Sequence, residues 1–136
     1  MALPEFPTFI EGRHRGGFIV RESAGSFRSR DLATLTNSSA AAITYPAGLV
    51  LEIATAQSGT TPAVVLPYSS TVTAGTPGAL LFEPVTVLAG ATMKVTIVSR
   101  DAEVNAAELA YDASITTAAA QATLLAVLAT KGIIAR

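Results

Sequence analysis

The chain has no cysteine and no tryptophan, and it contains a single histidine. The absence of cysteine excludes a disulfide framework, a thiolate metal site and a cysteine nucleophile. One histidine excludes a metal site built from several histidines, and it leaves His14 as the one histidine that could serve as a base. We therefore expect neither a metal ion nor a cofactor.

Charge is also scarce. Charged residues make up 14% of the chain, against roughly a quarter in an ordinary soluble domain, and the formal net charge is −1. This balance argues against direct binding to nucleic acid or to a membrane surface. The chain has no run of about 18 apolar residues, so we expect no transmembrane helix, and its first residues do not resemble a signal peptide.

Alanine, by contrast, is abundant, with 26 of the 136 residues. A chain of this length forms one domain and buries about two thirds of the surface that its unfolded state exposes. Alanine fills such a core thinly, so oligomerisation is a natural way to add buried area. Between Arg30 and Lys94 there is no basic residue, and the Ala, Thr, Ser, Gly, Pro and Val of this stretch favour β-structure with many turns.

Residues 1–17 are predicted to form an extended arm. Pro4 and Pro7 favour extended backbone, and the glycines that flank residues 13–15 make a flexible joint. The arm nevertheless contains several large apolar residues, whereas disordered tails are normally poor in aromatic residues. We interpret it as a segment that a partner surface holds in place.

Alternation of apolar and polar residues predicts a strand over residues 92–99, with Met93, Val95 and Ile97 on the buried face. A second strand is expected over residues 18–22. Residues 23–26 then form either a hairpin or a tight bend, after which residues 27–31 return. Further strands are expected at 49–54, 63–66, 79–82 and 85–88, with turns at 45–48 and 73–78 and a loop at 57–62.

One long helix is predicted near residues 117–131. Thr116 or Thr117 can cap its start, and Gly132 suits its end. Its apolar residues surround the helix, so we expect one side to meet the body and another side to meet a neighbouring subunit. A helical turn is expected after Asn105, because Glu108 follows three residues later, and residues 133–136 are expected to be strand-like.

No catalytic constellation is present. His14 lies in a flexible arm, whereas a general base needs a fixed pocket. Arg100, Asp101 and Glu103 indicate an ion-pair network at a surface or interface better than a metal site. Residues 12–17 are not a phosphate-binding loop, because they lack the Gly-Lys-Ser/Thr sequence that ends such a loop. They resemble arginine–glycine RNA-binding tracts, but the motif occurs only once. We favour arginines that pair with acidic groups of a protein partner.

Five segments, in order, carry a resemblance to a known family. They are Phe18-Ile19-Val20-Arg21-Glu22 with Gly25 and Ser29-Arg30-Asp31, Tyr45-Pro46-Ala47-Gly48-Leu49-Val50-Leu51, Val98-Ser99-Arg100-Asp101-Ala102-Glu103-Val104-Asn105, Leu109-Ala110-Tyr111, and Leu128 to Arg136. Together these segments are similar to lambda-type bacteriophage head decoration proteins, from Phe18 to the C-terminus.

The resemblance implies a mainly β domain over residues 18–136, a bent ribbon of the β-clip type with a C-terminal α-helix. It implies a homotrimer, made in the host cytoplasm, that binds the major capsid protein on the outer surface of an expanded head. Such trimers occupy threefold and quasi-threefold positions and resist the pressure of packaged DNA. The implied function is structural, without enzymatic activity.

Combining this implication with the composition of the arm, we assign candidate residues to two surfaces. Leu124, Leu125 and Leu128 are candidates for trimer or core packing. The candidates for capsid contact are Phe6, Phe9, Ile10, Arg13, Arg15, Phe18 and Arg21.

Two other functions remain open from the sequence. One is a trimeric fibre, adhesin or carbohydrate-binding β-domain. Sugar binding commonly uses aromatic side chains for stacking, and the chain offers few beyond Tyr45, Tyr68 and Tyr111. The other is an enzyme on a trimeric β-clip scaffold, such as a nucleotide hydrolase. That class needs acidic metal-site and glycine-rich phosphate motifs, which the sequence does not contain.

Overall fold

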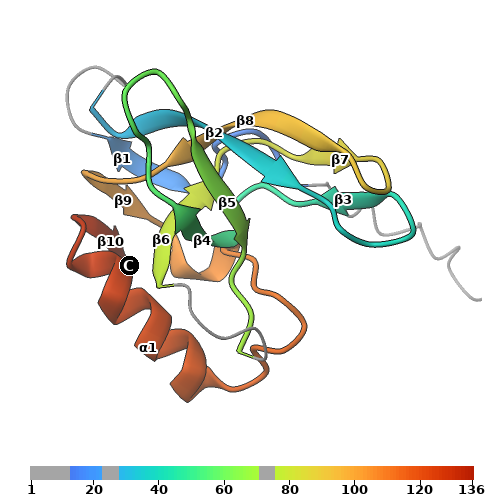
Figure 1. Ribbon diagram of the computed structural model, residues 1–136. Helices are drawn as coiled ribbons and strands as arrows, with labels where there is room; N and C mark the ends of the chain where they lie inside the picture. The colour runs from blue at the N-terminus through green and yellow to red at the C-terminus, as the bar shows by residue number, and fades with distance from the viewer. Residues whose placement is uncertain (1–12, 23–27, 71–75) are drawn as a thin grey trace, which may run out of the picture.

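The computed structural model describes residues 13–22, 28–70 and 76–136. Within these ranges the chain forms short strands, one 3₁₀ turn and one α-helix near the C-terminus (Figure 1). The prediction of a mainly β protein with a C-terminal helix is therefore confirmed. The bent ribbon of the β-clip type stays a prediction.

Five strands form a closed barrel. Each places alternate side chains inside, where Leu35, Leu51 and Ile97 are almost completely buried. β2 pairs with β8 in antiparallel fashion along its whole length and with β5 in parallel fashion on its other side. In their order around the barrel, the strands are β2 (Arg30–Thr36), β5 (Ala63–Pro67), β4 (Val50–Thr55), β6 (Pro77–Leu81) and β8 (Thr92–Val98).

A second, three-stranded sheet lies beside the barrel. β9 (Ala102–Val104) is its central strand, with β1 (Ile19–Glu22) antiparallel on one side and β10 (Ile133–Ala135) parallel on the other. Of the two connections left open for residues 18–31, the hairpin is therefore wrong, because β1 and β2 pair with different partners. The apolar residues of β2 fill the barrel, whereas those next to β1 join a separate core. The predicted turn at residues 23–26 lies outside the described residues.

Two short strands, β3 (Ile43–Tyr45) and β7 (Val85–Val87), form a ribbon at the right of Figure 1. The predicted turn after Tyr45 is confirmed, and Gly48 is required in it. Its φ is +78°, and a Cβ atom there would lie 3.0 Å from the carbonyl oxygen of Glu108.

The predicted helix is confirmed as α1 (Ala118–Ala129). The Thr117 side chain accepts a hydrogen bond from the backbone N–H of Ala120, and the chain leaves the helix through Gly132, whose φ is +79°. Leu124 and Leu128 are buried in a second core with residues of the three-stranded sheet, and Leu125 packs against its edge. The small residues on the other side of α1 are exposed in the single chain.

Three local predictions have different outcomes. The turn after Asn105 is confirmed as a 3₁₀ helix over Ala106–Glu108, with the Asn105 side chain as its cap. Met93 is 41% exposed, which contradicts its predicted burial, because β6 pairs only with the far end of β8 and leaves Met93 uncovered. Pro77 and Gly78 belong to β6 and not to a turn, and a Cβ atom at Gly78 would lie 2.9 Å from Ile53.

Candidate functional site

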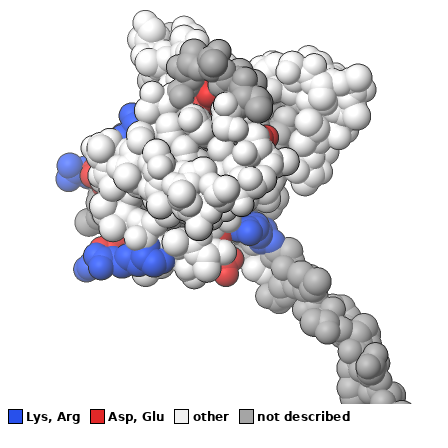
Figure 2. Space-filling model, turned by 90° about the horizontal axis from the view of Figure 1, so that it is seen from below, with Lys and Arg blue, Asp and Glu red and all other residues white. Residues whose placement is uncertain are grey.

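Most of the ion pairs of the described residues lie at one end of the molecule, around β1, β9 and β10. Figure 2 shows several Lys and Arg groups at the left of this face, on the side of these strands in Figure 1. A further basic group lies at the lower right beside the grey segment, and the broad area between them is uncharged. We call this region the charged end. It comprises Glu22, Arg30, Asp31, Arg100, Glu103 and Arg136.

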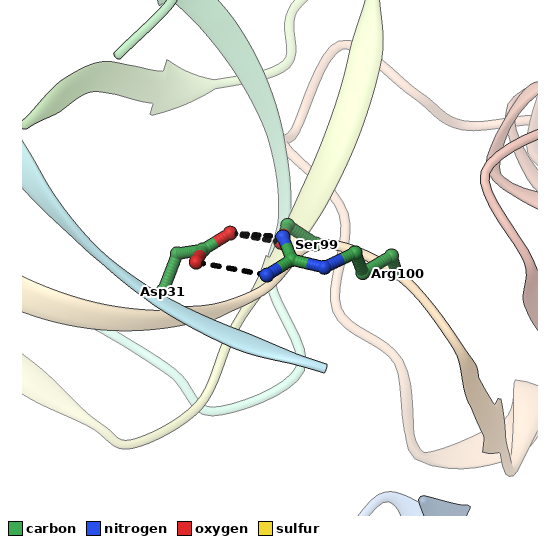
Figure 3. Close-up of polar contacts among 3 residues, drawn as sticks. All are labelled: Asp31, Ser99 and Arg100. Carbon is green, nitrogen blue, oxygen red and sulfur yellow. Dashed lines mark hydrogen bonds and ion pairs between the residues drawn. The ribbon is translucent and has the colours of Figure 1, made fainter. Parts of the chain in front are cut away.

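Asp31, at the start of β2, binds Arg100, which follows β8 (Figure 3). The two guanidinium NH₂ groups donate to the two carboxylate oxygens, and the Ser99 hydroxyl donates to Asp31 Oδ2 at 2.6 Å. The hydrogen bond from Arg100 lowers the pKa of Asp31, with a smaller contribution from Ser99 and with burial opposing both. The contact therefore connects the start of β2 to the residues that follow β8, which is its neighbour in the barrel.

Glu22, the last residue of β1, has a similar environment. It accepts hydrogen bonds from Arg30 Nε at 2.9 Å, from Arg30 Nη2 at 2.6 Å and from the Ser29 hydroxyl at 2.6 Å. The bonds from Arg30 are the main reason that the pKa of Glu22 is lowered. The Arg30 guanidinium also lies 3.9 Å from the ring centre of Phe82, a cation–π contact. These contacts attach the three-stranded sheet to the barrel.

The segment that follows β8 contributes a second pair, because Glu103 accepts a hydrogen bond from Arg136 at 2.8 Å. The ion-pair interpretation of this segment is therefore confirmed for Arg100 and Glu103. Asp101 has a φ of +49°, in the left-handed region, where the chain turns from β8 toward β9. Among the described residues, no group of three His, Asp or Glu side chains could hold a metal ion.

The charged end therefore consists of surface side chains that join strands of the same chain by ion pairs. The family model of the bacteriophage lambda head decoration protein D matches residues 8–133 of the 136. The chain belongs to this family. No curated protein and no solved structure matches it.

The protein is therefore a structural protein of the bacteriophage head that associates with the capsid. The matched range includes Glu22, Asp31, Arg100 and Glu103. In this decoration protein, these residues connect strands through ion pairs. In the described part of the chain, no helix is long and apolar enough to cross a membrane.

The predicted arm residues fall into two groups. Phe6, Phe9 and Ile10 lie outside the described residues. Arg13 and Arg15 lie against the body, where Arg13 donates to the backbone carbonyl of Glu108 and Arg15 forms an ion pair with Glu83. The backbone N–H of Gly16 also donates to the carbonyl of Phe82 at 2.8 Å. Residues 13–16 are therefore attached to the body of their own chain, at the 3₁₀ helix and at the residues that follow β6.

The remaining two candidates for capsid contact differ in exposure. Phe18 is 2% exposed and packs in the core beside Leu109 and Leu128, whereas Arg21 is exposed on β1. Because its ring is enclosed by the chain's own residues, Phe18 is not available at the surface. We keep Arg21 among the proposed contact residues and leave Phe18 out.

Sequence reasoning missed one group, the carboxylate of Glu52. This residue lies on β4 and is only 5% exposed, and its Oε2 accepts no hydrogen bond from any described residue. The signal was present, since Glu52 is the only charged residue between Asp31 and Glu83. It stands in the run Val50-Leu51-Glu52-Ile53, where a charge is unexpected.

Proposed function

We propose that the protein coats the outer surface of an expanded phage head as a homotrimer at threefold and quasi-threefold positions. There it binds the major capsid protein and stabilises the shell against the pressure of packaged DNA. The observation that carries the proposal is the family match over residues 8–133. The protein acts by binding, and its proposed function requires no catalysis.

The uncharged outer side of α1 supports the homotrimer. Its exposed residues are small, mainly alanine, so another copy can approach closely without the cost of removing charges from water. The centre of the same face is uncharged in Figure 2. Closed symmetry is the rule for soluble homo-oligomers, and a threefold ring is one such arrangement.

The composition of the first residues supports capsid binding by the arm. We assign Phe6, Phe9 and Ile10 to contacts with the capsid protein, where an extended segment can add to the edge of a sheet. The attachment of residues 13–16 determines where this segment joins the body. Three arms of one trimer bind together, so weak individual contacts give tight attachment overall.

Stabilisation then follows from linkage. A ligand that binds only the assembled shell stabilises it in proportion to the logarithm of its concentration relative to the dissociation constant. Because each trimer contacts several capsid subunits, separating those subunits also requires breaking the contacts of the arms. The resistance to internal pressure therefore increases with the occupancy of the sites.

A deletion of residues 2–12 tests the role of the arm, because it keeps the attached residues 13–16. We expect an unchanged melting temperature and no coating of purified undecorated heads, measured by co-sedimentation and electron microscopy. As a matched control, Pro4→Ala leaves the three apolar contact residues in place and should coat normally. Saturation of the heads by the truncated protein would show that the arm does not provide the attachment.

A further inference from the structure

The carboxylate of Glu52 is buried without a partner for one of its oxygens. The side chain is only 5% exposed, and Oε2 accepts no hydrogen bond within the described residues. Burying an unpaired carboxylate is costly, because the protein interior replaces the water that would solvate the charge. A positively charged group from outside the chain would remove this cost.

A cavity lies next to Glu52 and has a shape and chemistry suited to such a group. Its volume is about 320 Å³, and the end of β2, the loop after it, β3 and β5 contribute to its wall. Ile43, Leu66 and Pro67 supply apolar surface, and Asp112 supplies a second carboxylate. The aliphatic part of an arginine or lysine can lie along such a wall while its charged head reaches the carboxylates.

Within the described residues, no basic side chain of the same chain binds Glu52 Oε2. There is no basic residue between Arg30 and Lys94, and Arg30, Arg100 and Arg136 are engaged in ion pairs at the charged end. Arg28 differs from these three. It is exposed just before β2, lines a hollow beside β1 and β9, and forms no ion pair with a described residue.

We propose that Arg28 of one copy enters the cavity of a neighbouring copy and binds Glu52. The beginning of β2 lies at the left of Figure 1, and β3, which lines the cavity, lies at the right. Complementary groups on opposite sides of a molecule give head-to-tail contacts, and such contacts close into a ring when the rotation permits. This inference rests on the proposed homotrimer and identifies a pair of residues that holds it together.

A crosslinking experiment tests the pairing on the full chain, both bound to undecorated heads and in concentrated solution. Because the chain has no cysteine, the Arg28→Cys/Glu52→Cys variant carries only two thiols. We expect a short bismaleimide to join the two thiols between copies and to give a ladder that ends at three chains on a denaturing gel. The matched control is Lys94→Cys/Glu52→Cys, in which the exposed basic residue lies elsewhere on the barrel and should give no ladder.

A second measurement uses variants that keep the shape of the cavity. Glu52→Gln should raise the protein concentration needed to coat heads by about thirtyfold, since one member of a buried charge pair is lost. Arg28→Gln should have the same effect, and the double variant should lose no more than either single variant. The melting temperature of each variant verifies that it is folded.

Three outcomes would overturn the pairing. They are the absence of a ladder in both preparations, equal ladders from the control, and losses for Glu52→Gln and Arg28→Gln that add in the double variant. The proposed function fails separately, if the unmodified protein does not coat heads. In that case the ladder in concentrated solution still decides whether Arg28 meets Glu52.

Discussion

Different kinds of polar contact stabilise the two ends of the molecule. At the charged end, guanidinium groups bind carboxylates, as between Asp31 and Arg100. At the end around β3 and β7, hydroxyl and amide groups take their place. We call this second region the hydroxyl end, and it comprises Thr36, Asn37, Thr44, Thr86 and Thr92.

The difference indicates which region responds to the solution. The threonine pairs, Thr36 with Thr92 at 2.7 Å and Thr44 with Thr86 at 2.8 Å, contain no titratable group. Ion pairs weaken with added salt, and they are lost when their carboxylates are protonated. We therefore expect the ion pairs of the charged end, and not the threonine pairs of the hydroxyl end, to make stability depend on pH.

The largest effect is expected at the hydroxyl end, from Asn37→Ala. Asn37 is 1% exposed, and its amide donates to the carbonyls of Ala41 at 2.8 Å and Val87 at 2.9 Å. Without the amide these carbonyls lose a partner, so the free energy of unfolding should fall by about 3 kcal/mol. Urea denaturation at pH 7 and at pH 5 measures the loss, which should be the same at both values.

The matched control for this variant is Ser38→Ala, an exposed neighbour in the same loop. Its free energy of unfolding should change by less than about 0.5 kcal/mol. A loss for Asn37→Ala that is no larger than that of the control would mean that the buried amide contributes little. The hydroxyl end would then depend on its strands alone.

A smaller effect, which unlike that of Asn37→Ala depends on pH, is expected from Asp31→Asn. The folded-state pKa of Asp31 lies below its ordinary value, so the pair adds stability above that ordinary value and loses it as the pH falls through the folded pKa. Because Arg100 is 43% exposed, solvent screens the pair and the loss at pH 7 should be about 1 kcal/mol. The two proteins should converge in stability as the pH falls through the folded-state pKa of Asp31.

Thermal unfolding followed between pH 2.5 and pH 7 measures this convergence. Asp101→Asn serves as the control, because that carboxylate acts on Arg100 only through its charge, whereas Asp31 forms the ion pair and the hydrogen bonds. A constant difference between Asp31→Asn and the unmodified protein at all pH values would show that shape, and not charge, accounts for the effect.

Local signals explain the features that could be predicted from sequence. The cap at Thr117 and the stop at Gly132 act within one turn of the helix, and the alternation around Val95 and Ile97 reports one buried face. The ion pairs near Arg100 were predictable in kind, because charges of both signs occur at Arg100, Asp101 and Glu103. The exact partner, Asp31, was not, because it lies 69 residues away.

Long-range pairing explains most of the features that could not be predicted. β1 contains nothing that distinguishes β9 from β2 as its partner, because both choices satisfy the same alternation. Asn37 resembles a surface residue in sequence, although the fold buries it almost completely. The apolar neighbours of Glu52 mark it as unusual, but the cavity beside it is formed by residues that are distant in sequence. The contacts of Phe6, Phe9 and Ile10 depend on a partner and therefore stay a prediction.

The smallest effect is expected from Thr44→Val in the ribbon of β3 and β7. The variant removes a hydroxyl that bonds Thr86 across the strands but keeps the branched shape that strands favour. Both side chains are exposed, so water can replace the lost partner, and the free energy of unfolding should fall by about 0.5 kcal/mol at every pH. Urea denaturation of Thr44→Val, Thr86→Val and the double variant measures the coupling between the two hydroxyls. A coupling energy well above about 1 kcal/mol would mean that an exposed threonine pair stabilises the fold as much as an ion pair of the charged end does. A coupling energy that changes with pH would mean that the hydroxyl end, too, depends on titratable groups. Either result would remove the distinction between the two ends.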